Sequence, residues 1–329
     1  MIELDSVKIH STGMYVPSNV TSNDDLTKWM DTSDEWIRQR TGIEQRHLSE
    51  GENTSDLCIK ATENILRDIS VDPEEIGLII VATVTPDTQT PSVASKVQSA
   101  IKAKNAIAFD LSAACTGFVY GLSVADKMLK QMQSDYALVI GGEVLSKAID
   151  WSDRRTAVLF GDGAGGVLLK KEKSDSDLFV EDLHTDGDKG EAIKIGGRKL
   201  NNPLFTSEDE SEGFMEMDGR SVFNFVTKTI PGSIEAVLNK EDLEMADIDY
   251  VLFHQANAKM IEIVAKKLNS PIEKFPMNIQ KYGNTSAASV PILLDELVRN
   301  KILTLGSKQK IILSAFGGGL TWGTVLIEL

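Results

Sequence analysis

A cysteine at the start of a predicted helix is the strongest candidate for chemistry in this sequence. Cys115 lies in FDLSAACTGFVYGL (109–122), between an apolar strand pattern and an amphipathic helix pattern. The free N–H groups and the dipole at a helix N-terminus favour the thiolate, which is the nucleophilic form of cysteine. The alternative is a buried structural cysteine, and on this feature alone both interpretations stay open. Cys58, inside a predicted helix, is expected to lie in the core.

His254 and Asn284 are the candidate partners of this nucleophile. Among the four histidines, only His254 follows a strongly apolar strand and precedes a helix, in VLFHQANAKMI (251–261). Ligand-binding and catalytic groups collect at such strand ends in α/β folds, although a hydrogen-bonded core imidazole is the alternative. Asn284 lies in KYGNTSAASVPILL (281–294), where it is either an ordinary helix cap or part of the same cluster.

Two glycine-rich segments each allow more than one interpretation. The three glycines of SAFGGGLTWG (314–323) follow a predicted strand, and they present an N–H to a developing oxyanion, form a hairpin turn, or do both. Gly161, Gly163 and Gly166 match the spacing of a dinucleotide-binding loop, which requires a helix to begin there. The following GVLLKK predicts a strand instead, so we interpret this segment as a tight turn between strands.

The elements around these candidates predict an α/β fold with buried parallel sheets. Apolar β-branched runs indicate strands, and apolar residues at three- and four-residue spacing indicate helices. The predicted strands are 77–84, 106–111, 136–140, 250–254, 310–314 and 323–329. The predicted helices are 55–69, 92–103, 116–132, 221–239, 257–268 and 285–299. Pro231-Gly232 is expected to kink or split the helix 221–239.

The two halves of the chain resemble one another. Three segments of the first half have counterparts in the second: YALVIGGE (136–143) with KIILSAFGGG (310–319), the Cys115 helix with GNTSAAS (283–289), and GLIIVATV (77–84) with YVLFHQA (250–256). We interpret this as a duplicated α/β unit, with residues 1–170 and 171–329 as the two halves. A pseudo-twofold relation would place equivalent loops at one shared site. Residues 170–218, including EDESE (208–212), are interpreted as a solvated connecting or capping region.

The composition argues against several classes of protein. The 329 residues contain 34 Lys and Arg against 49 Asp and Glu, and this net charge of −15 disfavours nucleic acid or an anionic membrane as a partner. Two cysteines argue against a disulfide framework and for a reducing compartment. No signal-peptide pattern is visible, and the longest apolar run, 76–84, is too short to cross a bilayer. We therefore expect a cytoplasmic protein.

Six motifs together resemble the β-ketoacyl-acyl-carrier-protein synthase III family, the thiolase-fold condensing enzymes that initiate bacterial type II fatty acid synthesis. The resemblance runs from STGMYVPS (11–18) to the final glycine run. The motifs are DTSDEWIRQRTGI (31–43), AACTGF (113–118), FGDGAGG (160–166), HQAN (254–257), GNTSAASVP (283–291) and FGGGLTWG (316–323). The resemblance implies a five-layer αβαβα homodimer, no metal or cofactor, and Cys115, His254 and Asn284 as the catalytic triad.

The implied reaction is a decarboxylating Claisen condensation. An acyl-CoA, usually acetyl-CoA, acylates Cys115, and the acyl group then condenses with malonyl-acyl carrier protein to give 3-oxoacyl-acyl carrier protein, CoA and CO₂. The N–H groups of Cys115 and Gly318 would stabilise the first oxyanion. Neutral His254 and Asn284 would stabilise the enolate formed by decarboxylation.

The resemblance also implies the substrate contacts. The residues expected to bind CoA or substrate are Trp36 and Arg154 around the adenine, Arg40 at the phosphates, Asn257 at the pantetheine arm, and Phe316. The residues expected to bind the carrier protein are Lys259, Lys266 and Lys267, for which a solvated helix face is the alternative.

Three positions depart from the family pattern. Thr90 stands where many relatives carry Phe, at a position that reaches the acyl pocket of the partner subunit, so longer or branched primers are expected to fit. Arg220 and Asn224 replace the usual Asn and Lys, which leaves the pantetheine and carrier-protein contacts of that segment open.

Four other functions compete with this interpretation. A thiolase requires a second active-site cysteine near the C-terminus, and no cysteine follows residue 115. A hydroxymethylglutaryl-CoA synthase requires a catalytic Glu, for which no matching motif is evident. A non-catalytic subunit typically lacks the nucleophile, which is present here. A cysteine hydrolase would transfer the acyl group to water and is distinguished by its products.

Overall fold

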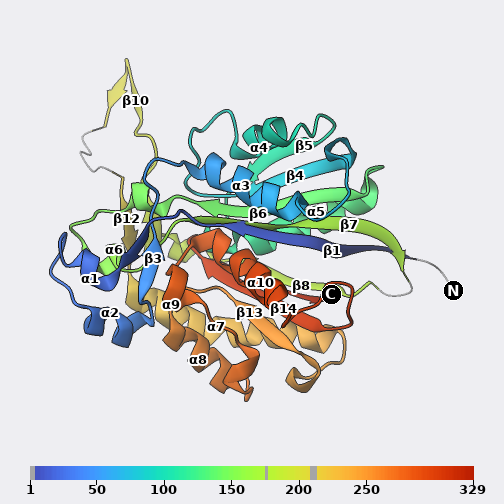
Figure 1. Ribbon diagram of the computed structural model, residues 1–329. Coiled ribbons are helices and arrows are strands. Elements are labelled where there is room, and N and C mark those ends of the chain that lie inside the picture. The colour runs from blue at the N-terminus through green and yellow to red at the C-terminus, as the bar shows by residue number, and fades with distance from the viewer. Residues whose placement is uncertain (1–3, 175–176, 208–212) are drawn as a thin grey trace.

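Two β-sheets form the framework of the computed structural model, which describes residues 4–174, 177–207 and 213–329 (Figure 1). The first sheet has the order β1 (Leu4–Tyr15), β7 (Gly163–Ser174), β6 (Tyr136–Glu143), β4 (Ile76–Ala82) and β5 (Ile107–Leu111). The second has the order β8 (Phe179–Thr185), β15 (Thr321–Glu328), β14 (Lys310–Gly317) and β13 (Tyr250–Phe253). Both sheets are mixed: β4 pairs in parallel with β5 and β6, and β13 with β14, whereas the remaining pairs are antiparallel.

Helices form three layers around these sheets. The outer face of the first sheet is covered by α3 (Thr54–Leu66) and α4 (Val93–Ile101). Between the two sheets lie α5 (Gly117–Gln131) and α10 (Ser289–Arg299). The outer face of the second sheet is covered by α7 (Gly219–Lys240), with α8 (Ala258–Lys267) packed beside it. Figure 1 shows the resulting five-layer αβαβα arrangement, as predicted.

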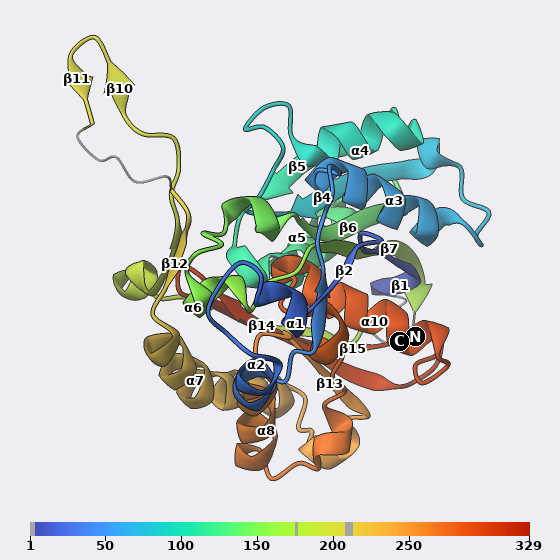
Figure 2. The same cartoon turned by 60° about the vertical axis from the view of Figure 1, so that its left-hand side comes forward.

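Smaller elements surround one end of this framework. They are β2 (Val20–Ser22), α1 (Asn23–Leu26), α2 (Asp34–Thr41), β3 (Gln45–His47), α6 (Arg154–Ala157), β9 (Ile193–Ile195), β10 (Asn201–Asn202), β11 (Phe205–Thr206), β12 (Met215–Met217) and α9 (Ile279–Tyr282). Figure 2 shows β10 and β11 as an arm that projects from the body of the molecule. Leu204, between these strands, is 96% exposed.

The largest part of the core lies between the sheets. Phe118 and Leu122 of α5 and Leu293 of α10 pack with Val139 of β6 and Leu313 of β14, and all five side chains are buried. Burial of large apolar side chains is the main stabilising contribution in such a layer. This shared core fixes the N-terminal ends of α5 and α10 relative to each other, and these ends carry the candidate site.

The order of the strands is consistent with the proposed duplication. In each sheet one long strand, β6 or β14, has a parallel neighbour on one side and an antiparallel neighbour on the other. Each middle helix follows a 3-10 turn that begins with a left-handed residue, Ala114 at φ 47° and Ser286 at φ 51°. The division at residues 170 and 171 falls inside β7 and stays a prediction.

Three interpretations of the sequence require comment. The strand at Gly163 confirms that no helix follows the GDGAGG segment. The interpretation of the segment as a turn between strands is wrong, because Gly163 and Gly166 lie within β7 itself and the preceding element is the helix α6. The helix α7 runs through Pro231 as a single element, so Pro231-Gly232 does not split it, and the alternative of a kink stays a prediction. The segment 170–218 is more than a connection, because it supplies β8 and the pair β9–β12; EDESE lies outside the described residues. Within the described ranges, no helix has the length and apolar character needed to cross a membrane.

Candidate active site

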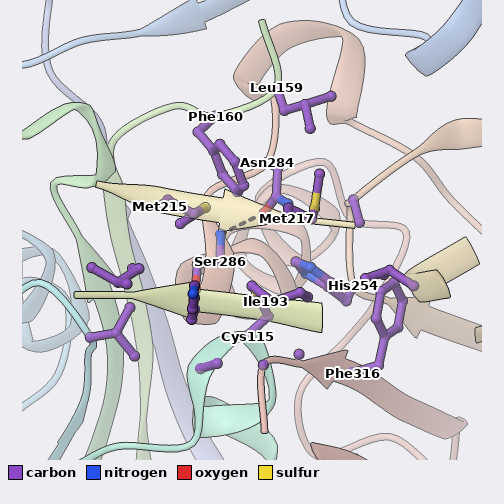
Figure 3. Close-up of a pocket in the computed structure, with 18 of the residues that line it drawn as sticks. Cys115, Leu159, Phe160, Ile193, Met215, Met217, His254, Asn284, Ser286 and Phe316 are labelled. Atoms are coloured by element: carbon purple, nitrogen blue, oxygen red, sulfur yellow. Dashed lines mark hydrogen bonds between the residues drawn. The ribbon is translucent and has the colours of Figure 1, made fainter. Parts of the chain in front are cut away.

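One cavity of about 1340 Å³ brings the predicted site residues together (Figure 3). Its lining includes Cys115, His254, Asn284, Gly318, Trp36, Arg40, Arg154, Asn257, Phe316 and Lys259. The β9–β12 pair forms another wall through Ile193, Met215 and Met217. The cavity therefore combines residues from both predicted halves of the chain, as a shared site requires.

Cys115 lies in the 3-10 turn Ala114–Thr116, between β5 and α5. Its backbone packs closely against the end of β14, because a Cβ on Gly317 would lie 2.6 Å from the Cys115 nitrogen. The side chain is partly exposed in the cavity. The pKa of its thiol is raised to about 12, mainly by burial and also by the charge of Glu143, while an interaction with the Ser286 side chain acts in the opposite direction. The expected thiolate-favouring effect of the helix N-terminus is therefore outweighed by loss of solvation.

His254 follows β13 directly and is almost completely buried, at 1% exposure. Its Nδ1 lies 2.6 Å from the Ser289 Oγ, and its ring packs edge-on against Phe316 with 5.0 Å between the ring centroids. Burial lowers the pKa of His254 to about 3, so the imidazole is neutral at physiological pH. A neutral histidine at this position can donate one hydrogen bond into the cavity without adding a positive charge.

Asn284 is fixed by hydrogen bonds on both its backbone and its side chain. Its N–H donates to the Leu159 oxygen at 2.9 Å, and its carbonyl accepts from the Gly161 N–H at 3.0 Å. Its Oδ1 accepts from the Ser286 N–H at 2.8 Å, the contact drawn as a dashed line in Figure 3. Because the amide oxygen has a partner, the NH₂ group is left as the donor that faces the cavity.

Gly161 explains why the GDGAGG segment is rich in glycine. A Cβ on Gly161 would lie 2.3 Å from the Tyr282 oxygen, so only glycine permits this approach to the Asn284 loop. Behind the segment, the buried Arg46 guanidinium donates to the Val158 oxygen at 2.8 Å. The segment thus supports the position of Asn284 rather than binding a dinucleotide.

Four of the predicted CoA and substrate residues, Trp36, Arg40, Arg154 and Asn257, form one cluster at the cavity. The guanidinium groups of Arg40 and Arg154 lie 4.6 Å and 5.2 Å from the ring centroid of Trp36. Asn257 caps α8, accepts from the Lys259 N–H at 2.9 Å and donates to the Arg40 oxygen at 2.9 Å. Because Arg154 already contacts the Trp36 ring, an adenine between the two side chains would require Arg154 to move away.

Other predicted residues lie outside this cavity. Thr90 is exposed, while its neighbours Thr88 and Gln89 line the cavity. Lys266 is exposed on α8, and Lys267 donates to the Thr227 oxygen at 2.8 Å. The structure thus places the three predicted lysines along one helix, with only Lys259 at the cavity.

Sequence reasoning missed two polar residues beside Cys115. Ser286 lies within the GNTSAASVP motif and lowers the pKa of the Cys115 thiol. Glu143 ends the strand β6 and accepts a hydrogen bond from the Ser286 hydroxyl. The one available signal for Glu143 was its position at the carboxyl end of an apolar strand. Neither contact could be read from local spacing, because Glu143 and Ser286 are far apart in the chain.

Comparison with family models and curated proteins places the chain among known condensing enzymes. Two models match, 3-oxoacyl-[acyl-carrier-protein] synthase III over residues 109–187 and its C-terminal region over residues 238–329. The β-ketoacyl-[acyl-carrier-protein] synthase III of Streptococcus mutans is 50% identical over 322 residues, which cover 98% of this chain and 99% of the relative. The same enzyme from Lactococcus lactis is 51% identical with the same coverage.

Solved structures agree with this assignment. The 3-oxoacyl-[acyl-carrier-protein] synthase III of Aquifex aeolicus matches with a TM-score of 0.90 and 41% identity, covering 98% of this chain and 100% of that structure. The enzyme from Thermus thermophilus matches with a TM-score of 0.91 and 36% identity, covering 98% and 99%. The chain therefore belongs to the β-ketoacyl-[acyl-carrier-protein] synthase III family, the thiolase-fold condensing enzymes that initiate fatty acid synthesis.

Proposed function

We propose that this enzyme takes an acyl group from acyl-CoA onto Cys115 and condenses it with malonyl-acyl carrier protein. The observation that supports this most directly is that a partly exposed thiol shares one cavity with a neutral imidazole and an oriented amide, Cys115 with His254 and Asn284. A nucleophile and two neutral donors suit thioester exchange followed by enolate formation.

In the first half-reaction the Cys115 sulfur attacks the thioester carbonyl. A carbon–sulfur bond forms to Cys115, the bond to the CoA sulfur breaks, and CoA leaves. The oxyanion of the intermediate would be stabilised by the N–H groups of Cys115 and Gly318, which lie on adjacent segments that both line the cavity. Trp36, Arg40, Arg154 and Asn257 would hold the CoA moiety in the same cavity.

In the second half-reaction the malonyl carboxylate leaves as CO₂, and its bonding electrons form an enolate. The NH₂ group of Asn284 and the Nε2–H of His254 would stabilise the enolate oxygen. The enolate carbon then attacks the acyl carbonyl, and the bond to the Cys115 sulfur breaks. Neutral donors suit this step because they gain strength as negative charge develops on oxygen.

Ser289 would select the His254 tautomer that this step needs. Within the described residues, its hydroxyl has no hydrogen-bond partner besides the His254 Nδ1, and we infer that it donates there and leaves the proton on Nε2. Ser289→Ala should lower kcat for malonyl decarboxylation by about 10-fold or more and leave the acylation rate of Cys115 unchanged. Stopped-flow acylation and release of labelled CO₂ measure the two steps. Ser289→Thr, which retains the hydroxyl, should recover most of the loss; equal loss in both variants would contradict the tautomer role.

The partners follow from the surface around the cavity. Lys259 and Lys266 are exposed on α8, and we propose that these lysines and Lys267 contact the acidic carrier protein.

We also propose a homodimer, because β5 is an edge strand whose Ile107 is 54% exposed, and exposed apolar edges favour pairing. Light scattering that shows a monomer at working concentration would contradict the dimer.

Mass spectrometry of the intact protein tests the proposed function. After exposure to a panel of acyl-CoAs, the enzyme should gain one acyl group on Cys115, and Cys115→Ser should gain none on that residue. The preferred chain length tests the expectation that Thr90 leaves room for longer or branched primers. The adduct should disappear when malonyl-acyl carrier protein is added, with formation of a 3-oxoacyl product. Transfer of the acyl group to water instead would identify a hydrolase.

A further inference from the structure

Glu143 is a fully buried carboxylate that the mechanism above does not use. It lies at the end of β6, with 0% exposure, and among the described residues no Lys, Arg or His forms an ion pair with it. Its oxygens accept hydrogen bonds from the Thr83 hydroxyl at 3.0 Å, the Val84 N–H at 3.1 Å, and the N–H and hydroxyl of Thr85 at 3.0 and 2.5 Å. A buried acid is costly, so a carboxylate held in this way beside a catalytic cavity calls for a functional reason.

Ser286 connects this carboxylate to the nucleophile. Its hydroxyl donates to the Glu143 Oε1 at 3.3 Å. The turn that carries Ser286 packs against the turn that carries Cys115, and the Ser286 side chain lowers the pKa of the Cys115 thiol. Its backbone is fixed by the bond from its N–H to the Asn284 Oδ1, and the side chain is only 2% exposed. Ser286 therefore interacts with both Cys115 and Glu143 and connects the nucleophile to the carboxylate.

We propose that Ser286 and Glu143 form the proton relay that activates Cys115 for acylation. As the Cys115 sulfur forms its bond to the acyl carbon, its proton passes to the Ser286 Oγ, and the Ser286 hydroxyl proton passes to the Glu143 Oε1. The departing CoA thiolate takes a proton from solvent. When condensation later expels the Cys115 thiolate, Glu143 returns its proton along the same path. This inference rests on the proposed function, because it concerns the acylation of the same sulfur.

The electrostatics of the site support a relay. A thiol with a pKa of about 12 is almost entirely protonated at neutral pH, so attack requires a nearby acceptor. Burial lowers the pKa of His254 to about 3, which makes it a poor base, whereas burial raises the pKa of Glu143 to about 7, a suitable value for a general base. The negative charge of Glu143 acts to raise the pKa of three neighbouring titratable groups: Cys115, Cys58 of α3, and Lys147, which follows β6.

The pH dependence of single-turnover acylation tests the relay. Acetyl-CoA is mixed with the enzyme, and the Cys115 adduct is quantified by mass spectrometry from pH 5.5 to pH 9. The wild-type rate should rise with pH to a plateau, with a midpoint near 7 set by Glu143. Glu143→Gln and Ser286→Ala should each lower the rate at pH 7.5 by about 100-fold or more, the usual contribution of a general base. Their rates should instead rise about tenfold for each pH unit, because only solvent removes the proton.

A second variant separates this role from a structural one. Thr83→Val removes one donor to the Glu143 carboxylate but leaves the path through Ser286, so the midpoint of the acylation profile should move to higher pH while the plateau remains. The Thr83→Val measurement can be made whether or not the Glu143→Gln variant folds. A thermal unfolding curve of Glu143→Gln shows whether that variant is folded. A midpoint that does not move would overturn the relay.

The alternative role of Glu143 predicts the opposite result. If its charge only raises the pKa of the thiol, Glu143→Gln should acylate faster than wild type, and such a result would overturn the relay while leaving the proposed function intact. If wild-type enzyme forms no adduct with any acyl-CoA, the proposed function itself fails. The two failures are thus distinguishable in one set of measurements.

Discussion

Cys115→Ala should abolish condensation while malonyl decarboxylation continues. The proposed mechanism uses Cys115 of the cavity lining as the nucleophile for acyl transfer, and the variant lacks it. Formation of the 3-oxoacyl product should therefore fall by about 10⁴-fold or more. The two donors to the enolate are held by contacts that do not include the Cys115 sulfur. His254 is held by Ser289, and Asn284 is held by Ser286 and Leu159. Release of labelled CO₂ from malonyl-acyl carrier protein and formation of the product, measured in parallel, would show the separation.

Cys58→Ala is the matched control for this variant. Cys58 is the other cysteine of the chain, is fully buried in α3 and is not part of the cavity lining. Its removal should lower stability by about 1 kcal/mol through a small cavity and leave condensation at the wild-type rate. Residual condensation by Cys115→Ala, or its loss in Cys58→Ala, would contradict the assignment of the nucleophile. Burial of Cys58 also fits poorly with a thiolase, which needs a second cysteine in the active site.

The framework could be predicted from the sequence because its signals are local. Continuous apolar runs gave β4, β6, β13 and β14, and each observed strand begins within a residue of its predicted start. The β8 strand was missed because FVEDLHT contains neither a continuous apolar run nor a regular apolar–polar alternation, and it lies at a sheet edge with only partial burial. Edge strands of this kind lack the continuous apolar pattern that identifies an interior strand.

Local sequence signals also predicted part of the site. His254 follows β13 directly, and Cys115 lies in the turn between β5 and α5. Position along the chain was therefore enough to select both, and the structure brings them to one cavity. The protonation of Cys115 could not be predicted, because the helix N-terminus is a local feature whereas burial and the charge of Glu143 depend on tertiary packing. The link from Glu143 to Ser286 likewise depends on how η7 (Ser286–Ala288) packs against β6.

That packing also requires glycine in β6. A Cβ on Gly141 would lie 2.1 Å from the Ala287 oxygen, so any side chain there would displace η7. Ser286 precedes Ala287 in the same turn, and Asn284 lies just before that turn. The hydrogen bond between Ser286 and Asn284 depends on the position of the turn. A sequence pattern shows the glycine but not the turn that it accommodates, which explains why the role of this residue appears only in the structure.

Asn284 offers the sharpest test of how the enolate is stabilised. Asn284→Ala removes one neutral donor and should lower malonyl decarboxylation by about 100- to 1000-fold, the usual effect of losing one oxyanion donor. Asn284→Asp should be slower still. Its carboxylate has the same shape and can accept from the Ser286 N–H as the amide oxygen does, but it presents a negative charge where the enolate forms.

Acylation of Cys115 separates this effect from damage to the cavity. Both variants should still acquire an acyl adduct, because the NH₂ group of Asn284 takes no part in the first half-reaction. Mass spectrometry of the adduct and release of labelled CO₂ give the two readouts on the same preparation. The expected order of decarboxylation rates is wild type, then Asn284→Ala, then Asn284→Asp. Since Ala loses only a donor whereas Asp also adds charge, equal rates for the two variants would mean that Asn284 does not face the enolate oxygen.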